Sequence, residues 1–384
     1  MQPKEVRVGL IGCGIIAHQH LDNYAKIPGV KVVAICDVDD TVLADTAAQY
    51  GIEHTYRNFR ELLSRDDLDA VDVALHNNLH APVTCEVLRA GFNAYCEKPM
   101  AGAWADANAM LETARETGKM LHIQLAFLYS KETRAAKKLI DAGRLGHIYH
   151  ARSKGFRRRG RPYVDGYATK EFNQKWIASG GALYDMGVYH ISQLLYLLGR
   201  PKLERVTGRV YQELSMDAER QRVSGFDVEE LGVGFATYEN DLTFDLLESW
   251  AIHAKNFGGS MLAGSLGGVS FEPFSYHTFG DDLTMDVSVD FDLDEYRNHQ
   301  LNPGLIAYDS SQKHWVAALR GEVPLLPTAE IALDTMLLCE GIYLSGRLGR
   351  EVTADEIRAM SRSSALVSQE TPIGTLTYKP HPFK

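Results

Sequence analysis

Hydrophobic and polar positions follow two different patterns along the chain, and the change between them falls near residue 125. Before it, short apolar runs alternate with stretches of helical periodicity. This alternation predicts right-handed β–α–β units and a parallel, doubly wound sheet. The expected strands are Val6–Gly12, Lys31–Asp37, Ala70–Leu75, Asn93–Glu97 and Met120–Phe127. The expected helices are Ala17–Lys26, Thr41–Tyr50, Asn58–Leu63, Ala81–Ala90 and Trp104–Thr117.

Longer strand patterns follow a helix expected at Lys131–Ala142. Short turns join them, which is typical of a largely antiparallel open sheet. Many of these strand residues are apolar on both sides, so we expect a partner subunit to cover the second face. The expected strands are His147–Phe156, Leu203–Leu214, Glu230–Tyr238, Leu242–Ala254 and Gly267–Phe279. The acidic segment Gly280–Pro303 gives no clear pattern, and Thr328 is expected to cap a helix that ends at Leu348.

The chain of 384 residues is longer than one hydrophobic core usually fills. We therefore predict two domains: a Rossmann-like α/β domain at residues 1–125 and a second α/β domain, with the open sheet, at residues 126–384.

Composition and charge narrow the class of protein. The formal net charge of −10 gives no electrostatic support for a nucleic-acid partner. The five cysteines stand singly, without a CxxC pair, which favours reduced thiols and a cytoplasmic protein over disulfides or zinc. The sequence lacks an apolar run of about 18 residues and a signal-peptide core, so we expect no membrane partner.

The first expected strand leads into a Gly-x-Gly-x-x-Ala motif, Gly12 to Ala17. Gly12 lets the chain turn off the strand, and Gly14 lets a pyrophosphate approach the N–H groups of Ile15 and Ile16. The second expected strand ends in Asp37, at the distance where an acid binds the ribose hydroxyls of adenosine. Strand, motif, helix and acid together predict a dinucleotide-binding domain.

Asp37 also indicates which dinucleotide binds. It is followed by Val38, Asp39 and Asp40, with no Arg or Lys nearby in the sequence. Negative charge at this point repels a 2′-phosphate, so we predict NAD rather than NADP.

Glu97-Lys98-Pro99 follows the fifth expected strand. In a doubly wound sheet the carboxyl ends of the strands face the ligand, so Lys98 can lie beside a nicotinamide and stabilise an alkoxide. A surface lysine before a turn-forming proline is the alternative interpretation.

A second polar cluster lies at the start of an apolar helix, in the segment from Gly180 to His190. Asp185 and Tyr189 are four residues apart, so we expect them on one face of that helix, about one turn from each other. With His190 they form a candidate proton-handling set. Polar residues satisfied within the core are the alternative.

Taken together, Gly12-x-Gly14-x-x-Ala17, Glu97-Lys98-Pro99 and Gly180-Gly181-x5-Gly187-x-Tyr189 resemble the motifs of the Gfo/Idh/MocA family, the glucose–fructose oxidoreductase and inositol dehydrogenase group. The resemblance runs from residue 6 to about residue 200, and the late Gly346-Arg347-x-Gly349-Arg350 is similar to the family's usual ending.

This resemblance implies an NAD-binding Rossmann domain and a second domain that binds the substrate and forms a homodimer or homotetramer. It implies that Lys98 and Asp185 flank the substrate carbon that exchanges hydride. Tyr189 then stands at the acid/base position, and His190, directly after it, is the other candidate. Positions that match the family's nicotinamide-side contacts are Leu75, Asn77, His80, Glu97 and Lys98, although Leu75-His76 departs from the usual Thr-Pro.

Three weaker signals stay open. The basic run Arg157–Arg161 is either a clamp for an anionic substrate or a solvated or intersubunit loop. Glu248 and Trp250 share a face of a late strand and line either a sugar pocket or the core. His18 and His20 point apart on their helix, so no metal is predicted.

From these features we expect an NAD-dependent enzyme that transfers hydride between nicotinamide and a secondary hydroxyl or ketone of a sugar, a sugar derivative or a cyclic polyol. One alternative is a redox-neutral sugar enzyme, of the glycosidase, lyase or internal-oxidoreductase type, that holds NAD tightly. Another is a non-catalytic NAD-binding regulator.

Overall fold

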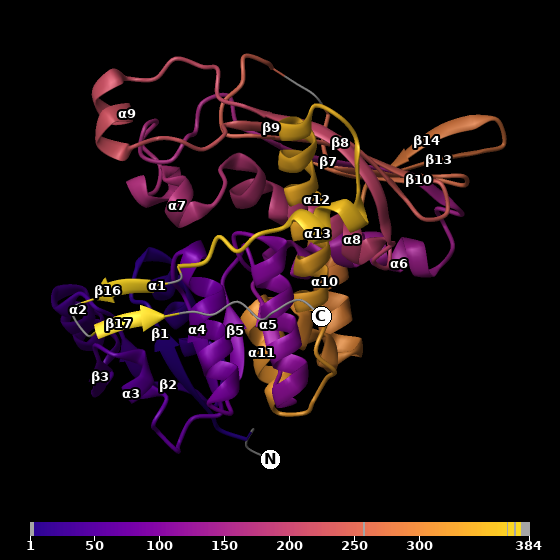
Figure 1. Ribbon diagram of the computed structural model, residues 1–384. Helices are drawn as coiled ribbons and strands as arrows, with labels where there is room; N and C mark the ends of the chain where they lie inside the picture. Colours follow the sequence, from indigo (N-terminus) through magenta and orange to yellow (C-terminus); the bar gives the residue numbers. More distant parts are fainter. Residues whose placement is uncertain (1–3, 256–257, 367, 372–373, 378–384) are drawn as a thin grey trace. The chain divides into compact units, whose positions relative to one another are not determined.

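The computed structural model describes residues 4–255, 258–366, 368–371 and 374–377 (Figure 1). The chain forms two compact units. The first contains the residues up to 124, residues 307–330 and the described residues from 363 onward, and the second contains residues 125–306 and 331–362. The first change of unit lies at the residue where the sequence pattern changes. The two later returns to the first unit were not predicted.

The first unit is built on a six-stranded sheet in the order β3-β2-β1-β4-β5-β6, with every pair parallel. This confirms the predicted doubly wound sheet. The strands are β1 (Val6–Ile11), β2 (Val30–Cys36), β3 (His54–Tyr56), β4 (Ala70–Val73), β5 (Asn93–Cys96) and β6 (Leu121–Ile123). The helices are α1 (Ile15–Ala25), α2 (Asp40–Tyr50), α3 (Phe59–Leu62), α4 (Asn77–Arg89), α5 (Trp104–Thr117) and α11 (Ser311–Leu319).

Capping residues set the ends of these helices. Asp39 accepts hydrogen bonds from the N–H groups of Thr41 and Val42 at the start of α2, and Gly51 ends that helix with a φ of +65°. Gly118 ends α5 in the same way, with a φ of +65°. A left-handed backbone at this position favours glycine, which explains why both helices stop there.

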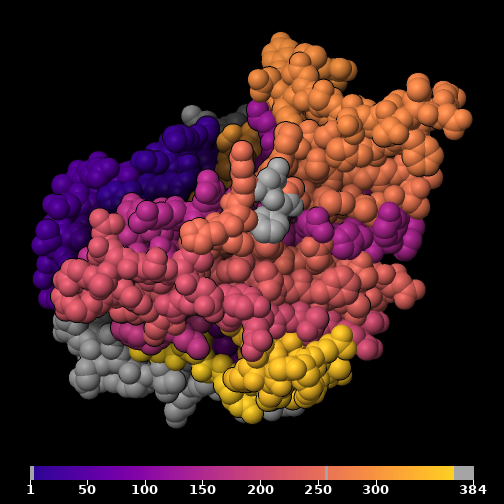
Figure 2. Space-filling model, turned by 90° about the horizontal axis from the view of Figure 1, so that it is seen from above, coloured from indigo at the N-terminus to yellow at the C-terminus, as the bar shows by residue number. Residues whose placement is uncertain are grey.

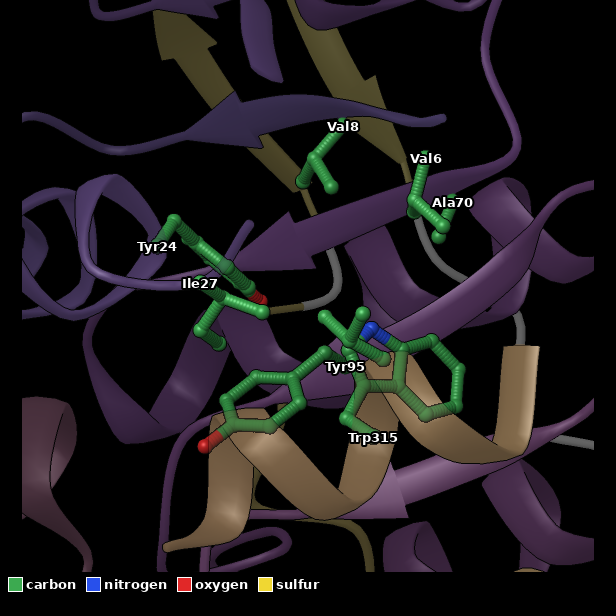
Figure 3. Packing of buried hydrophobic residues seen from close by; sticks show 8 residues of the cluster. Val6, Val8, Tyr24, Ile27, Ala70, Tyr95 and Trp315 are labelled. Carbon is green, nitrogen blue, oxygen red and sulfur yellow. The ribbon is translucent and has the colours of Figure 1, made fainter. Parts of the chain in front are cut away.

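The core of the first unit is completed by a residue from far along the chain. Trp315, in α11, is fully buried among Val6, Val8 and Ala70 of the central strands and Tyr95 of β5 (Figure 3). The Tyr95 hydroxyl also donates to Ser311 Oγ at 2.9 Å. The first unit therefore depends on α11, although the sequence motifs of this unit end near residue 125.

Pro82 lies inside α4, where it has no N–H to donate to the carbonyl of Asn78. That carbonyl instead accepts a hydrogen bond from the Leu366 N–H, at 3.0 Å. Asp106 on α5 holds the same C-terminal segment through the N–H groups of Ser364 and Ala365. These bonds explain why the chain returns to the first unit after residue 362. Farther along the chain, β16 (Ser368–Thr371) pairs with β17 (Gly374–Thr377).

The second unit contains a nine-stranded sheet in the order β14-β13-β12-β11-β7-β10-β9-β8-β15. Its pairs are antiparallel except β7 with β10, which confirms the largely antiparallel sheet. The strands are β7 (Ile148–Phe156), β8 (Leu203–Tyr211), β9 (Leu231–Tyr238), β10 (Leu242–Ser249), β11 (Met261–Gly264), β12 (Gly268–Phe271), β13 (Phe274–Gly280), β14 (Leu283–Val287) and β15 (Val352–Thr353).

One face of this sheet is covered by helices. Gly208 and Gly234 are paired across β8 and β9, and a Cβ at either position would lie about 3 Å from Ile342 of the helix above. The helices of this unit are α6 (Lys131–Asp141), α7 (Lys175–Ala178), α8 (Val188–Leu197), α9 (Ala218–Ser224), α10 (Phe291–Leu301), α12 (Thr328–Leu348) and α13 (Ala354–Met360). Shorter turns are η1 (Ala126–Tyr129), η2 (Lys170–Asn173), η3 (Leu183–Gly187) and η4 (Pro303–Tyr308).

The strand predicted at Gly267–Phe279 was wrong as a single element. The chain turns at Glu272-Pro273 and forms β12 and β13, because proline cannot donate a hydrogen bond to a strand ladder. The acidic segment after it forms β14 and α10. The β13–β14 hairpin extends beyond the neighbouring strands in Figure 1. In Figure 2 the atoms of this part of the chain, in orange, project from the surface at the upper right. Its exposed apolar side chains are Phe279, Leu283, Met285 and Val287.

All five cysteines are buried and unpaired, as the sequence indicated. In the part of the chain that the structure describes, no helix has both the length and the apolar character needed to cross a membrane.

Candidate active site

The glycine motif forms the turn that its sequence predicted. Gly12 has a φ of +94°, and a Cβ there would lie 2.3 Å from the Ala74 carbonyl oxygen, so only glycine fits. Gly14 is the N-cap of α1, and a Cβ on it would meet nothing within 4 Å. The first turn of α1 carries no acidic side chain, and Ile15 is 76% exposed. This open, uncharged helix start fits the pyrophosphate of a dinucleotide.

Asp37, at the end of β2, is tied to this turn. Its Oδ2 accepts the Cys13 N–H at 2.8 Å, and its Oδ1 accepts the Asp39 N–H at 2.9 Å. The structure also brings a cation to this loop, which the local sequence did not reveal. Arg57, just after β3, lies 3.1 Å from Asp40 and donates to the Val38 carbonyl at 3.5 Å. The statement that no basic residue lies nearby therefore holds along the sequence but not in space.

Glu97 belongs to a buried network that the sequence analysis missed. Its Oε1 lies 2.8 Å from His20 Nε2, and its Oε2 accepts the Lys98 N–H at 3.0 Å. His20 Nδ1 contacts both carboxylate oxygens of Asp72, and the Tyr24 hydroxyl donates to Asp72 at 2.9 Å. The His20 ring is completely buried between two carboxylates. Glu97 thus holds the backbone of Lys98, a role that differs from the predicted contact with the cofactor.

The charge of His20 follows from its two partners. Burial alone would lower the pKa of this imidazole, but Asp72 and Glu97 outweigh it and raise the pKa to about 10. Both ring nitrogens then donate, and His20 is an imidazolium at neutral pH. The pairing with His20 also explains why Glu97 can be buried just before Lys98, since burial of an unpaired carboxylate would raise the free energy of the folded state.

His80 also has a structural task. Its Nδ1 lies 2.7 Å from the Pro99 carbonyl oxygen and its Nε2 lies 2.9 Å from that of Leu75, and the ring is fully buried. Burial lowers the pKa of His80, so the neutral ring donates to one of these carbonyls, and its place between the loop after β4 and the loop after β5 is structural; its predicted contact with the cofactor stays a prediction. Asn77 begins α4 and is half-buried.

In the second unit, the double glycine precedes a tight turn. A Cβ on Gly181 would lie 1.9 Å from the Glu229 carbonyl oxygen, so no side chain fits there. The buried Glu229 carboxylate accepts the N–H groups of Gly181 and Leu183 at 2.8 and 3.0 Å. Burial raises the pKa of Glu229. This carboxylate fixes the start of the helical segment that carries the candidate acid/base groups.

The segment Leu183–Gly187 is a π-helical turn, and α8 continues from Val188. The expectation that Asp185 and Tyr189 share a face, one turn apart, assumed an α-helix throughout and does not hold for this turn. Asp185 is half-buried, and its Oδ2 accepts the indole N–H of Trp250 at 2.9 Å. The Tyr189 ring lies 5.2 Å from the ring of Phe127.

His190 is buried, with 7% of its surface exposed, and its Nδ1 lies 3.1 Å from Glu248 Oε2. The Ser153 hydroxyl donates to the other oxygen of Glu248 at 2.7 Å. Burial lowers the pKa of His190, but the charge and hydrogen bond of Glu248, together with Glu272 and the Met186 carbonyl, outweigh it, so the pKa is raised. The late-strand residues Glu248 and Trp250 thus contact the candidate acid/base groups instead of serving as core filling alone.

The basic run is not a free anion clamp. Arg161 is 2% exposed, and its guanidinium bonds Asp165 at 2.8 Å, Glu230 at 3.1 Å and two backbone carbonyls. Arg159 is paired with Asp165, and Arg157 lies over the ring of Tyr167. These contacts anchor the loop, and Asp165 and Glu230 pair with two of its arginines.

Lys98 is half-buried and belongs to the first unit, whereas Asp185, Tyr189 and His190 belong to the second. The contacts described above for Lys98, and those for the three residues of the second unit, are all made within the unit to which each residue belongs. Their combined action in one reaction stays a prediction.

Comparisons with known proteins agree with the two units. A family model described as "Oxidoreductase family, NAD-binding Rossmann fold" matches residues 6–125. The model of the GFO/IDH/MocA C-terminal domain matches residues 133–270.

The chain is 27% identical to the D-apiose dehydrogenase of Paraburkholderia graminis, over 93% of this chain and 92% of that protein. It is 29% identical to the D-glucoside 3-dehydrogenase of Escherichia coli, over 56% of this chain and 60% of that protein. Among solved structures, levoglucosan dehydrogenase in complex with NADH and levoglucosan is similar in fold, with a TM-score of 0.76, 20% identity, and coverage of 91% of this chain and 100% of that one.

Proposed function

The chain belongs to the GFO/IDH/MocA oxidoreductase family, and from this premise we propose that it is an NAD-dependent dehydrogenase of carbohydrates. Its reaction would be the oxidation of a secondary hydroxyl of a sugar, a sugar derivative or a cyclic polyol. Two relatives are named for sugar substrates, D-apiose and a D-glucoside, which supports this class of substrate.

The observation that carries the proposal is the proton-handling cluster after the double glycine. Asp185 is held by Trp250, and His190 is held by Glu248, so a carboxylate and an imidazole are each fixed by a buried partner. Groups held in this way suit general acid–base chemistry on a hydroxyl.

The first unit has the residues that NAD requires. The N–H groups of Ile15 and Ile16 would bind the pyrophosphate and Asp37 the adenosine ribose, while Leu75 and Asn77 remain predicted neighbours of the nicotinamide. When bound, NAD supplies the hydride acceptor.

The side chains then divide the work on the substrate. Lys98 would stabilise the negative charge that develops on the substrate oxygen, since its ammonium group carries a compact positive charge. Asp185 would orient the hydroxyl. Tyr189 or His190 would accept the hydroxyl proton as the carbon gives up hydride.

The test has two parts. Purified protein is denatured and any released NAD(H) is measured, and nicotinamide absorbance is then followed with added NAD over a panel of aldoses, glycosides, uronates and inositols. Cofactor-free protein that forms NADH steadily supports the proposal. Tightly retained NAD with product formation and no net NADH would instead indicate the redox-neutral reaction.

Lys98→Met tests the role of the lysine. We expect turnover to fall by about two orders of magnitude or more, with an NAD dissociation constant within about twofold of that of the wild type. Lys31→Met is the matched control, because Lys31 is exposed on β2 and pairs with Glu5. Undiminished turnover in Lys98→Met would remove this residue from the mechanism.

We also propose that the open face of the second sheet is a subunit contact. Phe235 lies on this face, opposite Asp245 of β10, and is 44% exposed. Light scattering on the wild type and on Phe235→Glu tests this, and a wild-type monomer would refute it.

A further inference from the structure

The π-helical turn decides which residue stands one turn from Asp185. In an α-helix this is the residue four positions later, but a π turn holds about one additional residue. The side-chain partners show the result. Asp185 contacts Trp250, and His190 contacts Glu248; Glu248 lies near the end of β10, and Trp250 directly follows the last residue of that strand, Ser249. Asp185 and His190, which flank the π turn, are therefore both held by residues at the C-terminal end of β10.

Glu248 is built into the sheet to hold the imidazole. It is fully buried, its Oε1 accepts the Ser153 hydroxyl at 2.7 Å, and its Oε2 lies 3.1 Å from His190 Nδ1. A carboxylate accepts and does not donate, so the bond at Oε2 requires the proton of the neutral imidazole to be on Nδ1. The Nε2 lone pair is then available as a base.

Glycines make room for this pair. A Cβ on Gly155 would lie 2.1 Å from Glu248 Oε2 and 2.6 Å from His190 Cε1. A Cβ on Gly187 would lie 3.1 Å from Glu248 Cγ. The backbone of β7 and of the π turn thus approaches the carboxylate so closely that a side chain at Gly155 would displace it.

Charged groups around the imidazole come from two other elements. Glu248 faces it from β10, and Glu272, in the turn between β12 and β13, has an oxygen 3.8 Å from Nε2. The Glu272 side chain is 56% exposed and too distant for a hydrogen bond. The η1 turn contributes the uncharged ring of Phe127.

We infer that His190, rather than Tyr189, accepts the substrate hydroxyl proton at Nε2, and that Glu248 is its positioning residue. This rests on the proposed dehydrogenase function. In the step, the O–H proton would move to His190 Nε2 while the carbon–hydrogen bond breaks with its electron pair and a C=O bond forms; NAD, when bound, would supply the acceptor for that hydride. His190 later returns the proton to solvent.

Four variants test the assignment: His190→Gln, Glu248→Gln, Tyr189→Phe and the control Asp245→Asn. Asp245 is a carboxylate on the same strand, but it faces the other side of the sheet, where it pairs with Arg152 at 2.8 Å. We expect kcat to fall by about 10²-fold or more in His190→Gln and by less than about tenfold in Tyr189→Phe. Asp245→Asn should retain the wild-type rate.

Glu248→Gln should have an effect that simple loss of packing would not produce. The pH at which kcat rises should shift downward, because the variant loses the carboxylate charge that raises the pKa of His190. An unchanged pH profile, or a larger loss in Tyr189→Phe than in His190→Gln, would overturn the inference.

A measurement without substrate separates this inference from the proposed function. In ¹⁵N-histidine-labelled protein, the His190 signal is assigned by its loss in His190→Gln, and its tautomer is read from the nitrogen shifts. We expect the Nδ1–H form in the wild type and a lower pKa in Glu248→Gln. If the panel gives no turnover but this tautomer is found, the dehydrogenase proposal fails while the pair stands; an Nε2–H tautomer overturns the pair.

Discussion

Replacing His20 by glutamine would remove a positive charge that is buried between Asp72 and Glu97. In the folded protein these carboxylates raise the pKa of His20 to about 10, against an ordinary value of 6.5. Between pH 6.5 and pH 10 the native state therefore keeps a proton on His20 that the unfolded state releases. This bound proton stabilises the native state fully below about pH 6.5, and the stabilisation is lost as the pH rises toward 10.

The magnitude follows from this linkage. Each unit of pKa difference corresponds to about 1.4 kcal/mol, so the proton contributes on the order of 5 kcal/mol at low pH. Between pH 7 and pH 9 the contribution should fall by roughly 3 kcal/mol. Other groups also titrate in this range, and for this reason the quantity to follow is the difference between wild type and His20→Gln.

Urea unfolding at several pH values from 6.5 to 10 measures this difference. His122→Gln is the matched control, because His122 is also fully buried in the first unit but burial lowers its pKa, so it stays neutral over this range. The wild type and this control should give parallel curves of unfolding free energy against pH. The His20→Gln curve should converge on that of the wild type as the pH rises. A constant offset between wild type and His20→Gln would refute the assignment of a buried imidazolium.

Three further changes should have defined effects. Asp37→Ala should lower the NAD-over-NADP preference in binding by roughly 10–100-fold, because a carboxylate acceptor is lost beside Arg57; equal ratios in titrations of the two cofactors would contradict this. Arg161→Leu should destabilise the protein by about 3–5 kcal/mol, since it leaves Glu230 buried without its cation; in thermal unfolding the exposed Arg158→Ala should shift little. Gly12→Ala should weaken NAD binding by at least about tenfold, as its Cβ would lie 2.3 Å from a carbonyl oxygen; calorimetric titration showing wild-type affinity would refute it.

The sequence by itself determined the features that depend on short segments. Strand–Gly12–helix–Asp37 is a local pattern whose chemistry acts over neighbouring backbone, so the dinucleotide-binding unit could be predicted from it. The alternation of apolar runs also predicted the parallel sheet and the change of pattern near residue 125. Lys98 and Asp185 were selected by motif, and their roles remain proposals.

Only the tertiary structure decided which distant residues meet. Nothing in the local pattern assigns Trp315 to the first core or brings Arg57 to the loop after Asp37. His20 was considered only as a metal ligand, because its carboxylate partners lie 52 and 77 residues away in the chain. Such pairs form when the sheet places strand ends side by side, and periodicity along one segment carries no information about them.

The clearest case is the pair of His190 and Glu248. The sequence placed Asp185 and Tyr189 on one face, because α-helical spacing is the default for an apolar helix. The extra residue in the π turn changes this spacing, and 58 residues separate His190 from the carboxylate that holds it. Motifs therefore identified the chemical groups, while the choice among them depends on backbone geometry and on buried partners that only the folded chain brings together.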